Sequence, residues 1–457
     1  MMKFYDRKKE MDLLSREFGL VRQKRLGRFV VVSGRRRVGK TSLLFKVAEE
    51  NKDFVFVYLF AFVSTESNLA GEWMRQVVRA LGLNFPPTFT KIIDVLRFLF
   101  ELGRNRPIAI FIDECQDLTH VNPVFWAELQ REWDLAKNST QTLLVQSGSA
   151  ASAMRLIFQD YGKPLFGRTD VFLQLRPFAP SVLQEILRDE KPDFSSEDLL
   201  LFYAVTGGVA RYAEQFVVTG ALSENAMIEE IFRDSSYFLT EAEVLLANDF
   251  KVESRYYSIL VEAIARGVTK RAELQNLVPE IQVSGLLDRL QKRYGMIRKV
   301  EPLFNMDYRK VRYSLNDPYL AFWYAFVHRE RTLLNAHQFD ELKRRFRQQY
   351  ADFSGRTLEG WFREKFWESG LYPQVGSWWD RKGENEIDLI AVNDERRIAW
   401  VFEIKRNSRK VDLRVLQSKA NAMLASCRSL DGYEIRTKGL SMDDMVRPVK
   451  EIAPFDA

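Results

Sequence analysis

The stretch Phe29-Val30-Val31-Val32-Ser33-Gly34-Arg35-Arg36-Arg37-Val38-Gly39-Lys40-Thr41-Ser42 decides the fold of the first part of this 457-residue chain. It begins as a β-branched run, continues as a Gly-x-x-x-x-Gly-Lys-Thr loop, and passes into an apolar helical pattern at residues 43–45. A strand, a glycine-rich loop and a helix in this order are the context that a phosphate-binding P-loop requires. The stretch therefore predicts a nucleoside triphosphate site.

The residue types of this loop suit a bound triphosphate. The two glycines let the backbone turn its N–H groups inward toward phosphate oxygens, and the start of the helix adds its positive end. Lys40 is predicted to reach the β- and γ-phosphates, and Thr41 to offer its hydroxyl to Mg²⁺. The arginines at 35–37 either contact phosphate or a lid, or face solvent or a neighbouring subunit. The predicted nucleotide-binding residues of the loop are Gly34, Arg37, Val38, Gly39, Lys40, Thr41 and Ser42.

Two further strand ends agree with a nucleotide site. The apolar run that starts at Pro107 ends in Asp113 and Glu114, the pattern of a Walker B strand. Asp113 is expected to hold Mg²⁺, directly or through water, and Glu114 to polarise the attacking water, which favours hydrolysis over binding alone. A third run, residues 142–149, ends in small polar residues. Its Ser147 is either a sensor of the γ-phosphate or of water, or part of an ordinary turn after a strand.

Composition limits the class of protein. Hydrophobic residues make up 46% of the chain and aromatic residues 13%, which excludes a disordered protein. The net charge of +6 permits nucleic-acid binding without requiring it. With two distant cysteines and three histidines, a zinc or histidine-based metal site is not expected. The chain shows no apolar leader and no membrane-spanning run, so we expect a cytoplasmic protein without a membrane partner.

Apolar strands alternate with longer helical stretches in residues 1–176, and this alternation predicts a parallel sheet covered by helices. The strand candidates are residues 28–33, 54–59, 107–112, 142–147 and 171–175. Residues 177–245 have helical periodicity and are expected to form a compact lid. Residues 250–330 are predicted to contain a winged helix and a linker helix, because three helical segments precede two short strands. Basic Arg289, Lys292 and Arg293 in that segment either contact DNA or belong to a fold used only for packing.

Residues 335–457 contain a second group of chemically active side chains. Residues 386–393 and 398–405 are predicted to be two strands of a hairpin, which pairs Asn393 with Ile398 and puts Asp388 opposite Glu403. Lys405 lies on the same face because side chains alternate along a strand. Two carboxylates and an ammonium can hold Mg²⁺ and an attacking water beside a phosphodiester, and Glu359 is the candidate third carboxylate. A surface hairpin with simple ion pairs is the alternative.

On these motifs nearly the whole chain resembles archaeal-type ATPases of the AAA+/STAND group that carry a C-terminal restriction-endonuclease-like domain. The resemblance rests on the P-loop, the Walker B strand end, residues 147–149, 163–169 and 206–212, and the join from Tyr313 to Trp323. It implies that Arg168 completes or senses the nucleotide site. It also implies a PD-(D/E)xK fold with Glu359, Asp388, Glu403 and Lys405 in the motif positions. Ala210 departs from the family's pattern, which has proline there.

These observations lead to one expected architecture and one expected function. The fold class is a multidomain α/β protein: a P-loop NTPase core with a parallel sheet, a helical lid, a winged helix and a C-terminal mixed α/β nuclease-like domain. The expected function is an ATP-hydrolysing switch that acts on nucleic acid, with DNA as the expected partner and ATP/ADP and Mg²⁺ as ligands. The alternative is a signalling or scaffold ATPase whose C-terminal domain binds DNA or protein without cutting. An oligomer is compatible with the sequence.

Overall fold

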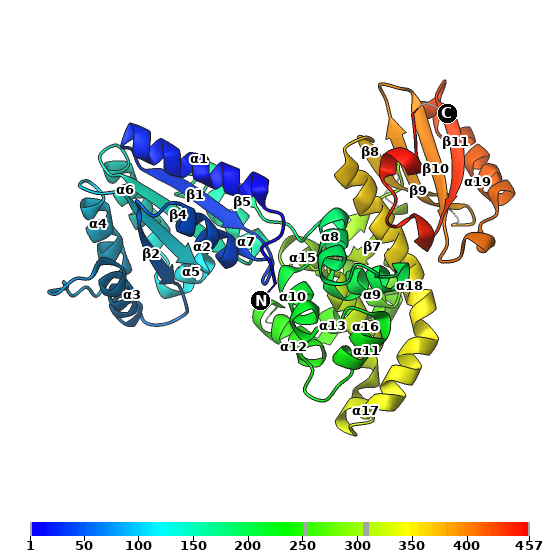
Figure 1. Cartoon of the computed structure of the whole chain (residues 1–457), viewed down its shortest axis with the longest axis horizontal. Helices are drawn as coiled ribbons and strands as arrows, with labels where there is room; N and C mark the ends of the chain where they lie inside the picture. Colours follow the sequence, from blue (N-terminus) through cyan, green and yellow to red (C-terminus); the bar gives the residue numbers. More distant parts are fainter. Residues whose placement is uncertain (1, 251–254, 305–309, 382, 456–457) are drawn as a thin grey trace. The chain divides into compact units, whose positions relative to one another are not determined.

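The computed structural model describes residues 2–250, 255–304, 310–381 and 383–455 (Figure 1). The chain divides into two compact units, Asp6–Arg176 and a second one made of Met1–Tyr5 with Pro177–Ala457. Parts of the predicted winged-helix range, residues 251–254 and 305–309, lie outside the described residues. No helix within the described ranges is long and apolar enough to cross a membrane.

The unit Asp6–Arg176 is a parallel sheet between two layers of helices (Figure 1). The strand order is β2-β3-β4-β1-β5, and each recorded pair is parallel. The predicted fold class is confirmed here, because each expected strand lies within one residue of an observed one. The elements in chain order are α1 (Lys8–Lys24), β1 (Arg28–Ser33), α2 (Lys40–Glu50), β2 (Val55–Phe60), α3 (Glu66–Leu81), α4 (Ile92–Leu102), β3 (Ile108–Asp113), η1 (Cys115–Asp117), α5 (Leu118–Val121), α6 (Phe125–Ala136), β4 (Thr142–Gly148), α7 (Ala151–Phe158) and β5 (Val171–Gln174).

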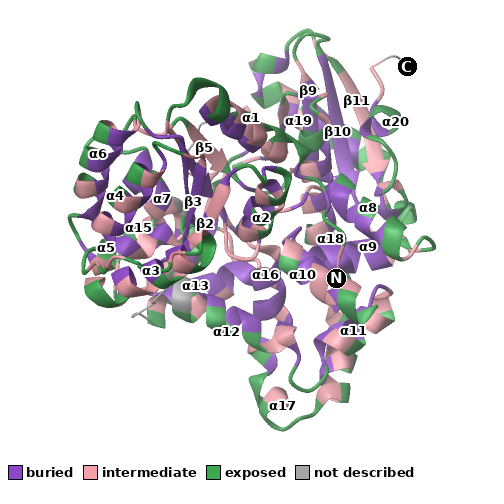
Figure 2. Cartoon of the chain, turned by 60° about the vertical axis from the view of Figure 1, so that its left-hand side comes forward, coloured by how far each residue is buried: buried purple, intermediate pink, exposed green. Residues whose placement is uncertain are grey.

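The central strands are apolar along their whole length because both faces of the sheet are covered. Val30 and Val32 of β1 pack with α1 and α2 on one face, while Phe29 and Val31 pack with α3, α4 and α6 on the other. Figure 2 shows strand β3 as buried, with exposed residues on the covering helices. Since all strands run in the same direction, the carboxyl ends of β1, β3 and β4 meet at one edge, which brings the P-loop, Asp113 and Ser147 together.

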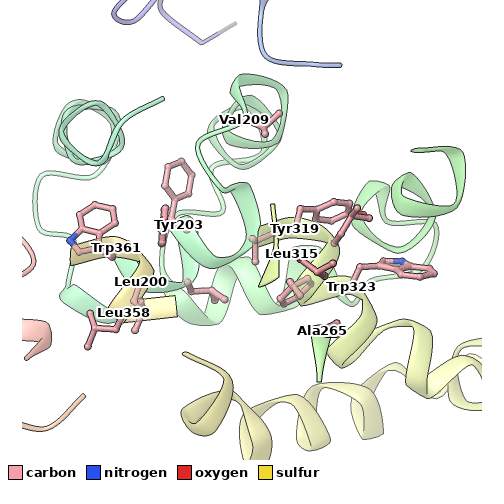
Figure 3. Close-up of a cluster of buried hydrophobic side chains, with 14 of the residues drawn as sticks. Leu200, Tyr203, Val209, Ala265, Leu315, Tyr319, Trp323, Leu358 and Trp361 are labelled. Carbon is pink, nitrogen blue, oxygen red and sulfur yellow. The ribbon is translucent and has the colours of Figure 1, made fainter. Parts of the chain in front are cut away.

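The second unit begins with a helical region built around α9. Residues Leu199 to Thr206 of this helix are all buried, so it is a central rather than a surface helix. Figure 3 shows Leu200 and Tyr203 of α9 beside Leu358 and Trp361, with the rings of Tyr203 and Trp361 5.1 Å apart. The helices of this region are α8 (Pro180–Glu190), α9 (Ser196–Thr206), α10 (Ala210–Thr219), α11 (Glu224–Ile231), α12 (Tyr237–Phe250), α13 (Arg255–Ala265), α14 (Arg271–Leu277), α15 (Val283–Lys292), α16 (Pro318–Phe326) and α17 (Arg331–Asn335).

A two-stranded antiparallel hairpin of β6 (Ile297–Val300) and β7 (Arg312–Leu315) follows α13, α14 and α15. Three helices and then a hairpin are the element order expected from the sequence. The apolar helix α16 follows directly and is buried on almost every side, as its sequence predicts. Two of its aromatic side chains use their polar groups, because the Tyr319 hydroxyl donates to the Phe238 carbonyl (2.8 Å) and the Trp323 indole N–H donates to the Leu239 carbonyl (3.0 Å).

The chain ends in a four-stranded mixed sheet with the strand order β11-β10-β9-β8. Strand β9 is antiparallel to β8 and β10, whereas β11 is parallel to β10. Helix α18 packs on one face of this sheet and α19 on the other. The elements are α18 (Phe339–Ser369), β8 (Gln374–Trp379), β9 (Glu386–Asn393), β10 (Ile398–Ile404), η4 (Ser408–Lys410), α19 (Leu413–Ser426), η5 (Arg428–Leu430), β11 (Glu434–Leu440), η6 (Met442–Asp444) and α20 (Val449–Ile452).

Candidate functional sites

The P-loop curls around the ammonium group of Lys40. Gly39 precedes α2 with a φ of 98°, a left-handed conformation that favours glycine. Lys40 is the first residue of α2 and is only 6% exposed. Its Nζ donates to the carbonyl oxygens of Gly34 (2.9 Å) and Arg35 (3.2 Å). The positive charge is therefore held inside the loop, where phosphate oxygens bind in P-loop proteins.

Arg7 holds this loop from the N-terminal side, a contact that we did not predict. Its side chain is buried, and its Nη2 donates to the carbonyl oxygens of Val38 (3.4 Å) and Arg176 (2.7 Å). Glu10, one helical turn away, lies 3.5 Å from Nη1, as the spacing of the two residues indicates. Burial lowers the pKa of Arg7. The available signal was an arginine before an amphipathic helix, which does not reveal its distant carbonyl partners.

Asp113 is the centre of the candidate nucleotide site. Its Oδ2 accepts a hydrogen bond from the Thr41 hydroxyl (2.8 Å), and its Oδ1 accepts one from the Ser147 hydroxyl (2.5 Å). The structure thus brings these three predicted residues together, and the sensor role of Ser147 stays a prediction. Tyr58 of β2 also donates to Oδ2 (2.9 Å), and sequence reasoning missed it. Burial, followed by the charge of Asp113, raises the pKa of Tyr58.

Glu114 leaves the sheet in a left-handed conformation, with a φ of 52° that is uncommon for a residue with a side chain. Two donors hold its carboxylate, the Gln116 amide (2.6 Å) and the Ser149 hydroxyl (2.7 Å). Strained backbone of this kind is concentrated at functional sites. These contacts fix the orientation of the Glu114 carboxylate, as its predicted role of polarising the attacking water requires.

The structure does not bring Arg168 to the P-loop of its own unit, and its role in completing or sensing the nucleotide site stays a prediction. Its Nη1 donates to the Phe166 carbonyl (3.0 Å), and its Nη2 lies 3.4 Å from Asp134 on α6. It precedes β5, close to where Arg28 at the start of β1 pairs with Asp170 (2.7 Å). This is the amino edge of a parallel sheet, whereas the P-loop follows the carboxyl end of β1.

The predicted cations of the α13–β7 region are partly engaged by the protein itself. Arg289 donates to the Tyr257 hydroxyl (3.4 Å), and Lys292 lies 3.7 Å from Asp288. The Arg293 guanidinium lies 5.6 Å from the centre of the Tyr294 ring. Such exposed contacts are weak and can be exchanged for phosphate.

A second group of charged side chains surrounds Lys405 in the C-terminal sheet. The observed register pairs Asn393 with Ile398 and continues to Leu389 opposite Phe402, so Asp388 and Glu403 occupy the next position. The Lys405 ammonium lies 3.5 Å from Asp388 Oδ2 and 3.4 Å from Glu403 Oε1. The three side chains that sequence reasoning placed on one face are therefore brought together.

Burial and charge act in opposite directions in this group. Burial raises the pKa of Asp388, although the Ile404 N–H (2.8 Å) and Lys405 favour its ionised form. Burial opposes the charge on Lys405, yet the carboxylates of Asp388 and Glu403 raise its pKa overall. The ammonium is therefore the charged form at neutral pH, and it compensates the carboxylates.

Glu359, the candidate third carboxylate, comes from a different element, and its role as a ligand stays a prediction. It projects from α18, the helix that covers the face of the sheet opposite to α19. Burial and the charge of Asp388 raise its pKa, so the two carboxyl groups still influence each other. In the described part of the chain, no group of three or more His, Cys, Asp or Glu side chains is arranged to hold a metal ion.

Sequence reasoning also missed two contacts of Glu403 that come from the segment after β10. Lys419 of α19 places its Nζ 3.7 Å from Glu403 Oε1, and the backbone N–H of Asp412 donates to Oε2 (3.2 Å). The sequence signal was a basic residue on the helix that follows Glu-x-Lys. Its distance from Glu403 depends on how α19 packs, so spacing alone could not reveal it.

The donor atoms of both sites fit Mg²⁺, a hard cation that prefers oxygen ligands. At the first site, the Thr41 hydroxyl and the Asp113 carboxylate lie within hydrogen-bond distance of each other. At the second site, the Asp388 and Glu403 oxygens both face the ammonium of Lys405. Two carboxylates with remaining positions for water and phosphate are a common Mg²⁺ arrangement.

Comparisons with known proteins agree with this geometry. Residues 4–216 match a family described as an ATPase domain predominantly from Archaea. Residues 323–416 match the family DUF234, described as Archaea bacterial proteins of unknown function. An uncharacterized protein of Methanocaldococcus jannaschii is 26% identical over 410 residues, which cover 88% of this chain and 87% of that protein.

Two solved structures share the fold. The Walker-type ATPase PABY2304 of Pyrococcus abyssi has a TM-score of 0.52 at 19% identity and covers 70% of this chain and 96% of its own. The ORC2 protein of Aeropyrum pernix, solved in ADPNP-ADP complexes, has a TM-score of 0.51 at 14% identity and covers 75% of this chain and 95% of its own. Residues 4–216 are thus similar to an archaeal-type ATPase domain, which supports ATPase activity, and residues 323–416 are similar to the DUF234 family.

Proposed function

We propose that this ATPase is a molecular switch of the AAA+/STAND type that acts on nucleic acid, with DNA as the preferred partner, and that its C-terminal domain is a Mg²⁺-dependent nuclease of the PD-(D/E)xK type. The observation that carries the nuclease part is the convergence of Asp388 and Glu403 on Lys405, within 3.5 Å and 3.4 Å. Two carboxylates and a lysine at adjacent strand ends suit the attack of water on a phosphodiester.

In the ATPase step, Lys40 exchanges the loop carbonyls for the β- and γ-phosphate oxygens. The Thr41 hydroxyl donates its hydrogen bond to Asp113, 2.8 Å away, so the lone pairs of its oxygen remain available for a cation. Glu114, held by Gln116 and Ser149, accepts a proton from the attacking water. Bound Mg²⁺ supplies neutralisation of phosphate charge at both sites. An arginine such as Arg168 completes this site only from another copy of the chain.

In the nuclease step, Lys405 stabilises the charge that develops on the phosphate, and Lys419 offers a second positive charge beside Glu403. The α13–β7 region is proposed to be a winged helix that contacts DNA through Arg289, Lys292 and Arg293. Hydrolysis would change the position of the helices in residues 177–245, and the winged helix and nuclease-like domain would follow.

The second candidate is a signalling or scaffold ATPase whose C-terminal domain binds DNA or protein without cutting. The pairing of Lys405 with both carboxylates favours it, because a compensated group is stable without a metal ion. The lack of a three-carboxylate group among the described residues favours it as well.

The deciding experiment is cleavage of labelled single- and double-stranded DNA and RNA with Mg²⁺ or Mn²⁺, with and without ATP. Asp388→Ala should abolish cleavage, and Lys40→Ala should abolish its response to ATP. Asp394→Ala is the matched control, because Asp394 is an exposed carboxylate at the turn of the same hairpin and should leave cleavage intact. If the wild-type protein turns over ATP and cleaves none of these substrates, the nuclease is refuted and the second candidate stands.

A further inference from the structure

We propose that the segment Asn407–Val415 is a docking surface for the phosphate backbone of DNA beside the carboxylate site. This inference rests on the proposed action on nucleic acid and names the surface that binds it. The segment belongs to residues 405–419, where six residues are basic and one, Asp412, is acidic. The whole chain, by comparison, contains 68 basic and 62 acidic residues. The positive charge is therefore concentrated here far above the average.

Three of these cations are available to a ligand. Arg409, Lys410 and Arg414 are exposed, and within the described residues their side chains form no ion pair or hydrogen bond with the protein. Among the described residues, Asp412 forms no ion pair with these cations. Its side chain instead accepts hydrogen bonds from the backbone N–H groups of Arg414 (2.9 Å) and Val415 and caps α19. Unpaired surface arginine and lysine side chains are the groups that replace counterions on a nucleic acid backbone.

The segment is ordered rather than a loose loop. The Asn407 side chain accepts from the Arg409 N–H (2.9 Å), and the 3₁₀ turn η4 closes with the Lys410 N–H on the Asn407 carbonyl (3.0 Å). Val411 anchors it against β11 at Gly439, where an added Cβ would come within 2.4 Å of the valine side chain. Because a side chain at position 439 would displace this anchor, the strand needs glycine there. A preorganised surface binds with less loss of entropy than a flexible one.

The segment is also directly joined to the carboxylate site. It starts after Lys405, and the Asp412 N–H in its middle donates to Glu403 Oε2 (3.2 Å). DNA phosphates bound by Arg409, Lys410 and Arg414 would therefore place neighbouring phosphodiesters near Glu403 and Lys405. Leu413 and Val415 are 52% and 45% exposed among these cations. Apolar side chains such as leucine insert between base steps in some protein–DNA complexes.

The test is binding of a fluorescent 30-bp DNA duplex, and of one of its single strands, to the full-length protein across a salt series without divalent cations. The variant carries Arg409→Gln, Lys410→Gln and Arg414→Gln. We expect binding of the duplex to weaken at least roughly tenfold, and the slope of log K against log salt to fall in magnitude by about 2 to 3, because each phosphate contact contributes about 0.9. ATP turnover and the thermal midpoint should not change, since the three side chains are exposed.

The matched control carries Lys9→Gln, Arg16→Gln and Lys24→Gln on α1, which removes the same charge from exposed positions of the ATPase unit. This control should bind like the wild type. If the wild type binds the duplex and the Arg409 triple variant binds equally well with an unchanged slope, the docking surface is refuted while the proposed function stands. If the wild type binds neither DNA probe at low salt, the proposed action on DNA fails and this inference fails with it.

Discussion

Lys365→Met is expected to stabilise the unit that contains the C-terminal sheet. Lys365 lies on α18, is 8% exposed, and donates through Nζ to the carbonyl oxygen of Met445 (2.7 Å). Burial lowers its pKa from 10.5 to about 8. The unfolded chain thus binds more protons than the folded protein between pH 8 and pH 10.5, and the free energy of unfolding rises with pH across this window. Below pH 8 the folded protein bears the full cost of the buried charge.

The size of this cost follows from the pKa. A difference of about 2.5 units, at about 1.4 kcal/mol per unit, corresponds to about 3 kcal/mol. Methionine fills a similar volume without a charge, and it removes one donor, which costs about 1 kcal/mol. The Met445 carbonyl keeps a partner, because the Gln184 amide also donates to it (2.8 Å). We therefore expect a net gain of about 2 kcal/mol at pH 7, and none near pH 10.5.

The assay is urea unfolding at pH 6 to 10.5, followed by circular dichroism, with the transition of the second unit fitted separately from that of the ATPase unit. Lys450→Met on α20 is the matched control, since this lysine is exposed and its replacement should leave the pH dependence unchanged. The reasoning is refuted if Lys365→Met is less stable than the wild type at pH 7 and the two pH profiles run parallel.

Three other outcomes can be measured. Lys40→Ala should lose ATP binding and turnover without a change in thermal midpoint, as fluorescent nucleotide titration would reveal, and full turnover would contradict the P-loop assignment. Tyr58→Phe should tighten Mg²⁺-ATP binding roughly tenfold in calorimetry, because a charge-assisted hydrogen bond worth about 1.5 kcal/mol no longer competes for Asp113, and weaker binding would show that the phenol supports the site. Arg406→Ala should destabilise the second unit by about 1 kcal/mol because it leaves the half-buried carboxylate of Glu197 without its partner. Arg406→Ala with unchanged unfolding would show that solvent satisfies this carboxylate.

The predictions from sequence were most accurate where a property is local. The P-loop needs glycines, a lysine and a threonine at set positions within one strand-loop-helix segment. The strand before it is a continuous apolar run that can be recognised without distant contacts. The hairpin around Asp394 to Arg397 is equally local, so counting residues from its turn gave the register of Asp388 and Glu403. Both results depend on neighbours in the chain rather than on distant packing.

The predictions were incomplete where a contact joins distant segments. Tyr58 reaches Asp113 because β2 lies beside β3 in the sheet, and Lys419 reaches Glu403 because α19 packs on that face. No sequence motif indicates that these elements become neighbours. The position of Arg168 likewise depends on the fold, since the direction of β5 places it at the opposite edge from the P-loop.

The sequence by itself determined the P-loop ATPase domain, its parallel sheet and the pairing of the C-terminal hairpin, because turn chemistry and hydrophobic period act over a few residues. The tertiary structure alone decided which side chains meet. It placed Tyr58 on Asp113, Lys419 beside Glu403, and the backbone N–H of Asp412 on the Glu403 carboxylate. These outcomes depend on which elements become neighbours, and that choice is made by burial of apolar faces across the whole fold.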